Sequence, residues 1–124
     1  MTQLVKFEVN KENVAIITLS DPDRLNALSL DMLNQLHERI KEINDEKTGA
    51  RCLIITGEGR GFCAGANLMD RSGNNTFENF NPGDALEKHY HPMLMDLKNV
   101  NVPLITAVNG PAAGAGCSFL RRPA

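Results

Sequence analysis

Two loops rich in glycine and alanine contain the residue types best suited to chemistry. The first runs from Gly57 to Leu68 (G-E-G-R-G-F-C-A-G-A-N-L) and the second from Gly110 to Gly116 (G-P-A-A-G-A-G). Small residues leave backbone N–H groups uncovered, so a substrate oxygen can approach them within hydrogen-bonding distance. Two such groups from different loops would form an oxyanion hole. One donor in such a site stabilises the transition state by roughly 3 kcal/mol. The same glycines could serve tight turns alone, and the residues by themselves support the two interpretations equally.

Each loop follows an apolar segment that is typical of a buried β-strand. These segments are Arg51 to Thr56 (R-C-L-I-I-T) and Pro103 to Val108 (P-L-I-T-A-V). If the two strands run parallel, both loops emerge at the same edge of one sheet. Two half-units that each end in a buried strand and a small-residue loop predict an α/β fold with a repeated supersecondary unit.

The remaining elements are predicted from hydrophobic periodicity. Leu4 to Val9 and Val14 to Leu19 are predicted strands, and the turn N-K-E-N between them favours a hairpin. Ser29 is a suitable N-cap for an amphipathic helix that extends to about residue 48, where a glycine stops it. Ala85 to Val100 is predicted as a second helix that Pro92 interrupts or kinks.

Composition limits the classes of function. The chain has 124 residues, of which 42% are hydrophobic and 23% charged, as expected for one globular domain. A formal net charge of -2 gives no basic surface for nucleic acid and no attraction to an anionic membrane. The sequence contains no apolar run of signal-peptide or membrane-spanning length. We therefore expect a cytoplasmic protein that binds neither nucleic acid nor membranes.

Several other candidate sites have simpler structural interpretations. Cys52, Cys63 and Cys117 match no zinc spacing and are expected to be reduced thiols, with a nucleophilic Cys63 as the lesser alternative. The glycines of the first loop have the wrong spacing for a dinucleotide fingerprint. His89 and His91 lie two residues apart on a predicted helix and make poor joint metal ligands. We expect no metal site.

Four stretches of the chain resemble the enoyl-CoA hydratase/isomerase (crotonase) family. They follow the family's order and are V-A-I-I-T-L-S-D-P-D-R-L-N-A-L-S (14–29), L-I-I-T-G-E-G-R-G-F-C-A-G-A-N-L (53–68), V-P-L-I-T-A-V-N-G (102–110) and P-A-A-G-A-G-C (111–117). The resemblance implies an α/β fold of the ClpP/crotonase type, a spiral of ββα repeats in truncated form. Residues 1–124 would be the N-terminal part of a crotonase-like acyl-CoA-binding domain.

The resemblance also implies a substrate and a set of site residues. The substrate would be an acyl-CoA thioester, whose carbonyl oxygen is bound by the backbone N–H groups of Ala66 and Ala115. Coenzyme A would enter as part of this substrate, with no separate cofactor. The implied CoA-binding residues are Arg24, Leu25, Ala27, Ala64, Asn67, Leu68 and Met69. The implied chemistry is stabilisation of a thioester enolate, in fatty-acid or related acyl-CoA catabolism, by a homotrimer or hexamer.

The sequence also departs from the family pattern. Ser118 stands where hydratases of the family usually carry a glutamate, and Asn67 stands where an aspartate is usual. The family is about twice as long, and its second acid/base residue lies in the half that is absent here. Ser118 favours an isomerase slightly over a hydratase. The alternative is a non-catalytic, truncated acyl-CoA-binding or interaction fragment without the acid/base residues.

Overall fold

The computed structural model describes residues 2–45, 48–65 and 89–114, which form one sheet and a layer of helices. The strands are β1 (Val5–Val9), β2 (Val14–Leu19), β3 (Cys52–Gly57) and β4 (Leu104–Ala107). The helices are α1 (Leu30–Asn44), α3 (His91–Lys98) and the short 3-10 helix η1 (Pro22–Arg24). Neither α1 nor α3, with 15 and 8 residues, has the length to span a bilayer.

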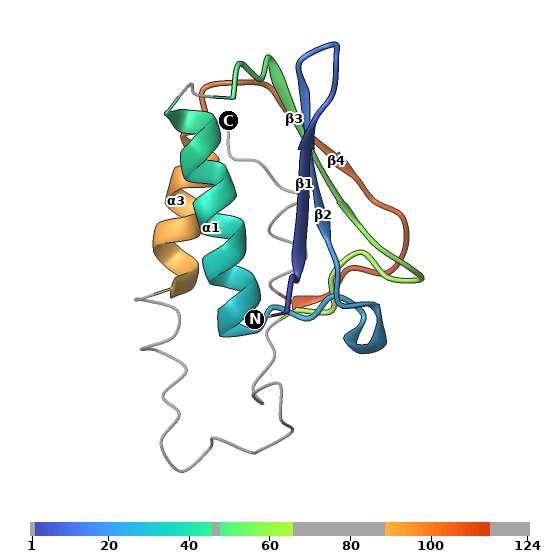
Figure 1. Ribbon diagram of the computed structural model, residues 1–124. Helices are drawn as coiled ribbons and strands as arrows, with labels where there is room; N and C mark the ends of the chain where they lie inside the picture. Colours follow the sequence, from blue (N-terminus) through green and yellow to red (C-terminus); the bar gives the residue numbers. More distant parts are fainter. Residues whose placement is uncertain (1, 46–47, 66–88, 115–124) are drawn as a thin grey trace.

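The sheet combines a hairpin with two parallel pairings (Figure 1). Its strand order is β1-β2-β3-β4. β1 and β2 pair antiparallel, whereas β2 with β3 and β3 with β4 pair parallel. Because β2, β3 and β4 run in the same direction, their carboxyl ends lie at one edge of the sheet. The segments that follow these three strands therefore begin close to one another.

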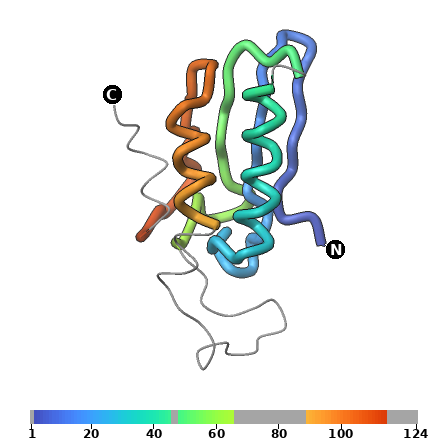
Figure 2. The backbone as a smooth tube through the Cα atoms, turned by 90° about the vertical axis from the view of Figure 1, so that its left-hand side faces the viewer, coloured from blue at the N-terminus to red at the C-terminus, as the bar shows by residue number. Residues whose placement is uncertain are grey.

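Helices α1 and α3 lie side by side on one face of the sheet (Figures 1 and 2). The Ser29 hydroxyl caps α1 by accepting a hydrogen bond from the N–H of Met32 at 3.1 Å. The inward side of α1 carries apolar side chains at helical spacing, and these are fully or almost fully buried: Met32, Leu33, Leu36, Ile40 and Ile43. They pack over the inward residues of the central strands, including Ile17 and Ile55. Burial of each such side chain stabilises the fold by about 1.5–3 kcal/mol.

Most predicted elements are confirmed, with one correction in the helices. The predicted hairpin is present, and the second predicted strand has the bounds of β2. However, α1 ends at Asn44, with Asp45 as its C-cap, and does not extend to residue 48. Pro92 lies in the first turn of α3, where a proline sacrifices no intrahelical hydrogen bond. Residues 89 and 90 directly before α3 are π-helical, so the predicted interruption of the α-helix near Pro92 is present. Residues 85–88 of the second predicted helix lie outside the described residues.

Strand β4 is less buried than its apolar sequence predicted. Its residues alternate between half-buried and exposed, and the Ile105 side chain is 53% exposed. β4 is the last strand in the sheet, and its outward residues lie on the face opposite α1 and α3. On that face Ile105 lies beside Ile54, which in turn lies beside Ile16. An apolar row thus crosses the outer face of β2, β3 and β4.

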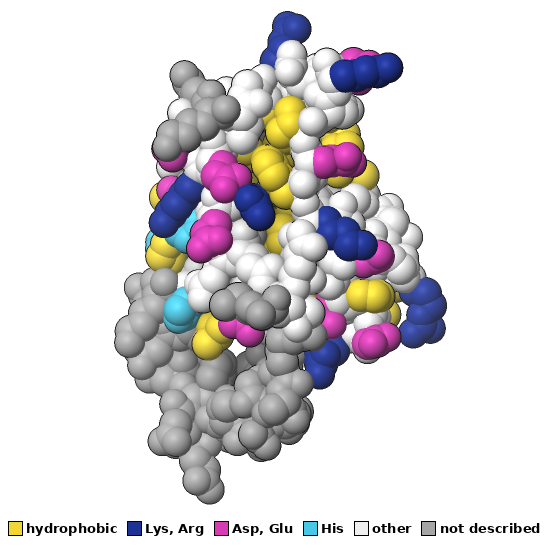
Figure 3. Space-filling model, viewed as in Figure 1, with side chains coloured by type: hydrophobic (Ala, Val, Ile, Leu, Met, Phe, Trp, Pro, Cys, Tyr) yellow, Lys and Arg dark blue, Asp and Glu magenta, His cyan; other side chains and the backbone are white. Residues whose placement is uncertain are grey.

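Charged side chains are distributed without a dominant sign. In the view of Figure 3, Lys and Arg side chains lie next to Asp and Glu side chains over both the helical layer and the sheet. The formal net charge is -2. This distribution offers no continuous basic surface on the face shown, in agreement with the composition.

Candidate functional site

The two glycine-rich loops lie side by side at the carboxyl edge of the sheet. Cys63 and Ala112 form an isolated parallel bridge beyond the ends of β3 and β4. The N–H of Phe62 donates to the carbonyl oxygen of Pro111 at 3.0 Å, and the N–H of Ala113 donates to the carbonyl oxygen of Cys63 at 3.0 Å. The predicted convergence of the loops at one edge is therefore confirmed for residues 57–65 and 110–114.

Glycine is required where the backbones of these loops approach most closely. A Cβ atom on Gly110 would lie 2.0 Å from the carbonyl oxygen of Arg60, well inside contact distance. A Cβ atom on Gly57 would lie 2.6 Å from the carbonyl oxygen of Phe62. No other residue type fits at these positions without displacement of the neighbouring backbone.

The turn that follows β2 lies against the first loop. The N–H of Ala64 donates to the carbonyl oxygen of Leu25 at 3.0 Å, and the N–H of Leu28 donates to the carbonyl oxygen of Gly65 at 2.6 Å. Leu25 adopts a left-handed backbone with φ 51° and leaves its side chain 36% exposed. An apolar residue of this size is unusual in that conformation, and such strain persists only where surrounding contacts maintain it.

Asn26 makes those contacts, and the sequence alone did not single it out. It is fully buried, and its φ of 58° is also left-handed. Its side-chain Oδ1 accepts from the N–H of Asp21 at 2.8 Å, while its Nδ2 donates to the carbonyl oxygens of Glu58 at 3.0 Å and Gly61 at 2.9 Å. The bond from Asp21 is local, but the other two reach residues more than thirty positions along the chain, so the turn after β2 is fixed to the first loop.

Asn109 binds the same loop from the side of β4. Its Oδ1 accepts from the N–H of Gly57 at 3.1 Å, and its Nδ2 donates to the carbonyl oxygens of Gly59 at 3.0 Å and Gly61 at 3.2 Å. Asparagine often forms such bonds to local turns. Here the amide joins two segments about fifty residues apart in the chain.

A charged cluster lies at the end of the same strands. Lys6 Nζ lies 2.8 Å from Glu58 Oε1, and the Ser20 hydroxyl donates to Glu58 Oε2. The hydrogen bond from Lys6, followed by that from Ser20, holds the pKa of Glu58 below its ordinary value. Glu58 is thus an ionised residue at neutral pH and suits a structural role better than proton transfer.

The structure brings together the predicted site residues that it describes. Arg24, Leu25 and Ala27 belong to the turn after β2, and Ala64 lies in the loop that this turn contacts. Arg24 also lies 3.6 Å from the carboxylate of Asp21. The other predicted site residues lie outside the described residues: Ala66, Asn67, Leu68, Met69 and Ala115. Their roles stay predictions.

Histidines in the described part of the chain make structural contacts. His37 Nε2 lies 2.5 Å from Asp96 Oδ2 and thereby connects α1 to α3. His89 Nδ1 lies 3.2 Å from Asn34 Oδ1. Among residues 2–45, 48–65 and 89–114, no three potential ligands gather as a metal site requires.

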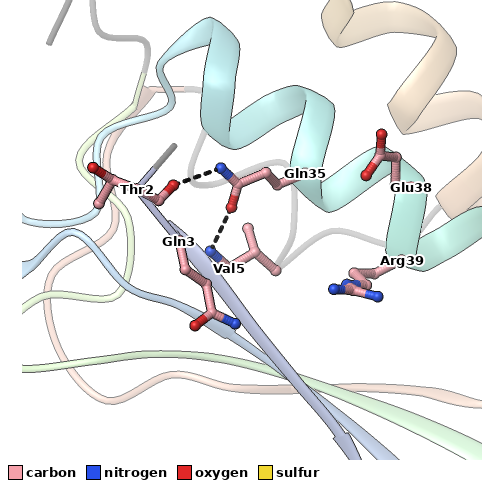
Figure 4. Close-up of a pocket in the computed structure, with 6 residues that line it drawn as sticks. All are labelled: Thr2, Gln3, Val5, Gln35, Glu38 and Arg39. Atoms are coloured by element: carbon pink, nitrogen blue, oxygen red, sulfur yellow. Dashed lines mark hydrogen bonds between the residues drawn. The ribbon is translucent and has the colours of Figure 1, made fainter.

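A surface pocket of about 210 Å³ lies away from the loops, between the start of β1 and helix α1 (Figure 4). The Gln35 amide donates to the Thr2 carbonyl oxygen at 2.9 Å and accepts from the N–H groups of Leu4 and Val5 at 2.8 and 3.1 Å. These bonds fix the start of β1 to α1. Because the Gln35 amide is used in these structural hydrogen bonds, the carboxyl edge of the sheet is the better candidate site.

Comparison with known proteins identifies relatives for nearly the whole chain. A family model described as enoyl-CoA hydratase/isomerase matches residues 9–121. The 1,2-epoxyphenylacetyl-CoA isomerase of Escherichia coli is 41% identical over 119 residues, which are 96% of this chain and 45% of that protein. A probable enoyl-CoA hydratase of Rhodobacter capsulatus is 35% identical over 115 residues, which are 93% of this chain and 42% of the relative. The chain therefore spans less than half the length of these relatives.

Solved structures agree with the sequence comparison. The enoyl-CoA hydratase of Bacillus anthracis superposes with a TM-score of 0.79 at 30% identity, over 94% of this chain and 44% of that one. The human enoyl coenzyme A hydratase domain-containing protein 3 superposes with a TM-score of 0.76 at 27% identity, over 95% of this chain and 45% of that one. The expected crotonase-like α/β fold is confirmed.

Proposed function

The chain belongs to the enoyl-CoA hydratase/isomerase family, and we propose that it binds an acyl-CoA thioester and stabilises the enolate of its acyl group. The observation that carries this proposal is the pairing of the two glycine-rich loops through Cys63 and Ala112. The turn that contains Arg24 and Leu25 contacts the first loop at Ala64 and supports a neighbouring contact surface for coenzyme A. Family membership supplies the class of substrate, and the loop pairing and the turn are compatible with it.

The proposed chemistry depends on backbone donors. The N–H groups of Ala66 and Ala115, which follow Gly65 and Gly114 in sequence, donate to the thioester oxygen. When a proton leaves the carbon next to the carbonyl, negative charge develops on this oxygen and the two donors stabilise it. A general base takes the proton. Ser118 is not that base, because a serine hydroxyl does not ionise near neutral pH.

We favour an isomerase over a hydratase. Hydratases of the family usually carry a glutamate where this chain has Ser118, and addition of water by two carboxylates loses one partner without it. The printed name of the Escherichia coli relative is also that of an isomerase of a CoA ester. A role in fatty-acid or related acyl-CoA catabolism, a place in the cytoplasm and assembly as a homotrimer or hexamer belong to the same proposal.

A second candidate function is acyl-CoA binding without turnover. Ser118 favours it, since it removes a proton-transfer carboxylate but leaves the described loop pairing unchanged. Binding and turnover measured on the same preparation separate the two functions.

The test uses a 2-enoyl-CoA and a 3-enoyl-CoA with the 124-residue chain. Conversion of the 3-enoyl to the 2-enoyl thioester, followed by absorbance, is the expected result for an isomerase. Binding detected by calorimetry without conversion of either ligand supports the second candidate instead. Absence of both binding and conversion overturns both functions for this chain.

Two variants of one residue test the proposed donor. Ala66→Pro removes the backbone N–H and is expected to lower turnover about a hundredfold, whereas Ala66→Gly retains the N–H and most of the activity. Equal activity of the two variants would show that this N–H does not contact the thioester oxygen.

A further inference from the structure

One carbonyl oxygen in the first loop accepts hydrogen bonds from two asparagine side chains. The Nδ2 of Asn26 lies 2.9 Å and the Nδ2 of Asn109 lies 3.2 Å from the carbonyl oxygen of Gly61. A carbonyl oxygen has two lone pairs, so both bonds form together. Gly61 is buried, which makes these bonds costly to leave unmade.

The two asparagines approach the loop from different segments. Asn26 lies in the turn after β2, and Asn109 lies after β4. Between them their amides donate to the carbonyl oxygens of Glu58, Gly59 and Gly61. The first loop is therefore fixed on one side to the turn and on the other to the start of the second loop.

Loop geometry next to this double contact is tight. A Cβ atom on Gly57 would lie 2.9 Å from the Nδ2 of Asn26, and one on Gly110 would lie 2.0 Å from the carbonyl oxygen of Arg60. At the far end of the described loops, a Cβ atom on Gly114 would lie 3.8 Å from the Cα of Gly65. The two loops therefore approach most closely at Gly110 and are still in van der Waals range at Gly114.

We propose that Asn26 and Asn109 are positioning residues that set the spacing of the two glycine-rich loops, and through it the spacing of the backbone donors that receive the thioester oxygen. The second part of this proposal rests on the proposed function, since the donors are those of Ala66 and Ala115. An oxyanion hole stabilises charge only if both donors are directed correctly before reaction. Displacement of one donor by about 1 Å costs on the order of a hundredfold in rate.

The test variant is Asn109→Asp, because Asn109 is exposed and the fold does not depend on its burial. The aspartate retains an acceptor for the N–H of Gly57 but loses the donors to Gly59 and Gly61. Asn26→Asp makes the corresponding change at the buried residue. Asn44→Asp is the matched control, because Asn44 Nδ2 donates to the Asp96 carbonyl oxygen at 3.3 Å, at the opposite end of α1 from the loops.

Amide hydrogen exchange tests the spacing without any ligand. Exchange of the Phe62 and Ala113 N–H groups, which bond across the two loops, is expected to accelerate about tenfold more in Asn109→Asp than exchange of the Leu53 N–H in the core. In Asn44→Asp all three rates should rise by one common factor. A common factor in Asn109→Asp as well would overturn the proposal, because it would indicate a general loss of stability.

The absorption band of bound hexadienoyl-CoA tests the consequence for the thioester. Polarisation of its carbonyl oxygen moves this band to longer wavelength, and the shift per bound molecule does not depend on how much protein is folded. Wild-type protein and Asn44→Asp are expected to give the same shift of the absorption band. Asn109→Asp is expected to give a smaller shift and a slower turnover of the enoyl-CoA substrate. An identical shift in Asn109→Asp would overturn the role in donor spacing.

A second variant of Asn26 separates hydrogen bonding from backbone strain. Asn26→Gly accepts the left-handed φ without strain but lacks the amide. It is expected to behave like Asn26→Asp, and full recovery of the shift in Asn26→Gly would overturn the proposal. If the wild-type chain binds no hexadienoyl-CoA, the proposed function fails, and the exchange rates alone then decide whether the two amides set the loop spacing.

Discussion

Gly110 lies where the two loops approach most closely, and its replacement measures the cost of separating them. Gly110→Ala places a methyl group 2.0 Å from the carbonyl oxygen of Arg60, so the backbone must move. We expect a loss of about 3 kcal/mol in the free energy of unfolding, measured with urea. Gly49→Ala is the control: Gly49 has a φ of 70°, but an added methyl group would meet no atom within 4 Å, so the loss should be only about 1 kcal/mol. Equal losses would contradict the close approach of the loops.

Glu58 makes stability depend on pH in a predictable direction. Its hydrogen bonds from Lys6 and Ser20 lower its pKa in the folded chain relative to the unfolded chain. The ionised carboxylate therefore contributes stability above the unfolded pKa, and this contribution is lost as the pH falls through the folded pKa. Relative to wild type, Glu58→Gln should lose stability at neutral pH and little below about pH 3. Urea unfolding across this range checks the prediction, with Glu12→Gln in the β1–β2 turn as the control for removal of one charge.

Among the elements, those with a local signal were predicted and those determined by distant contacts were not. Alternation predicted β1, a nearly continuous apolar run predicted β2, and the Ser29 cap located the start of α1. The end of α1 was placed too late, because the glycine at position 49 follows the helix by several residues. The exposure of β4 depends on its place at the edge of the sheet, which its own residues do not encode.

Helices α1 and α3 are joined by a contact between two side chains whose contributions to stability should be coupled. His37 is 18% exposed and lies 2.5 Å from Asp96. Asp96→Asn or His37→Ala should each cost about 1 kcal/mol in urea unfolding, and the double variant should cost less than their sum. Glu42→Gln breaks an exposed ion pair within α1 and should cost at most about 0.5 kcal/mol. Additive losses at His37 and Asp96 would show that the contact contributes nothing to the packing of the two helices.

For the candidate site, the sequence predicted the loops and their shared edge but not the contacts that fix them. Two small-residue loops after apolar strands sufficed for the first step. Asn26 and Asn109 gave no comparable signal, because each acts on carbonyl groups more than thirty residues away in the chain. The substrate came from family resemblance, since glycine and alanine carry no side chain that selects an acyl-CoA.

At the scale of the whole molecule, the apolar row on the outer face of the sheet predicts that copies of the chain associate with one another. Ile16, Ile54 and Ile105 form an apolar row there, while α1 and α3 cover the other face. Ile105→Lys should therefore reduce concentration-dependent association in size-exclusion chromatography with light scattering. Met95→Lys is the control, since Met95 is 40% exposed on α3 and lies outside this row. An equal effect of both variants would mean that overall charge, and not the sheet face, governs association.

The parallel pairing of β3 with β4 also bears on the order in which the strand pairings form during folding. The β1–β2 hairpin closes over a short turn, whereas β4 reaches β3 only across the long segment that includes α3. Pairings between distant residues form more slowly than local ones because a large loop must close first. During synthesis, the hairpin, α1 and β3 leave the ribosome before β4 exists. We therefore expect the edge where Cys63 meets Ala112 to assemble after the hairpin.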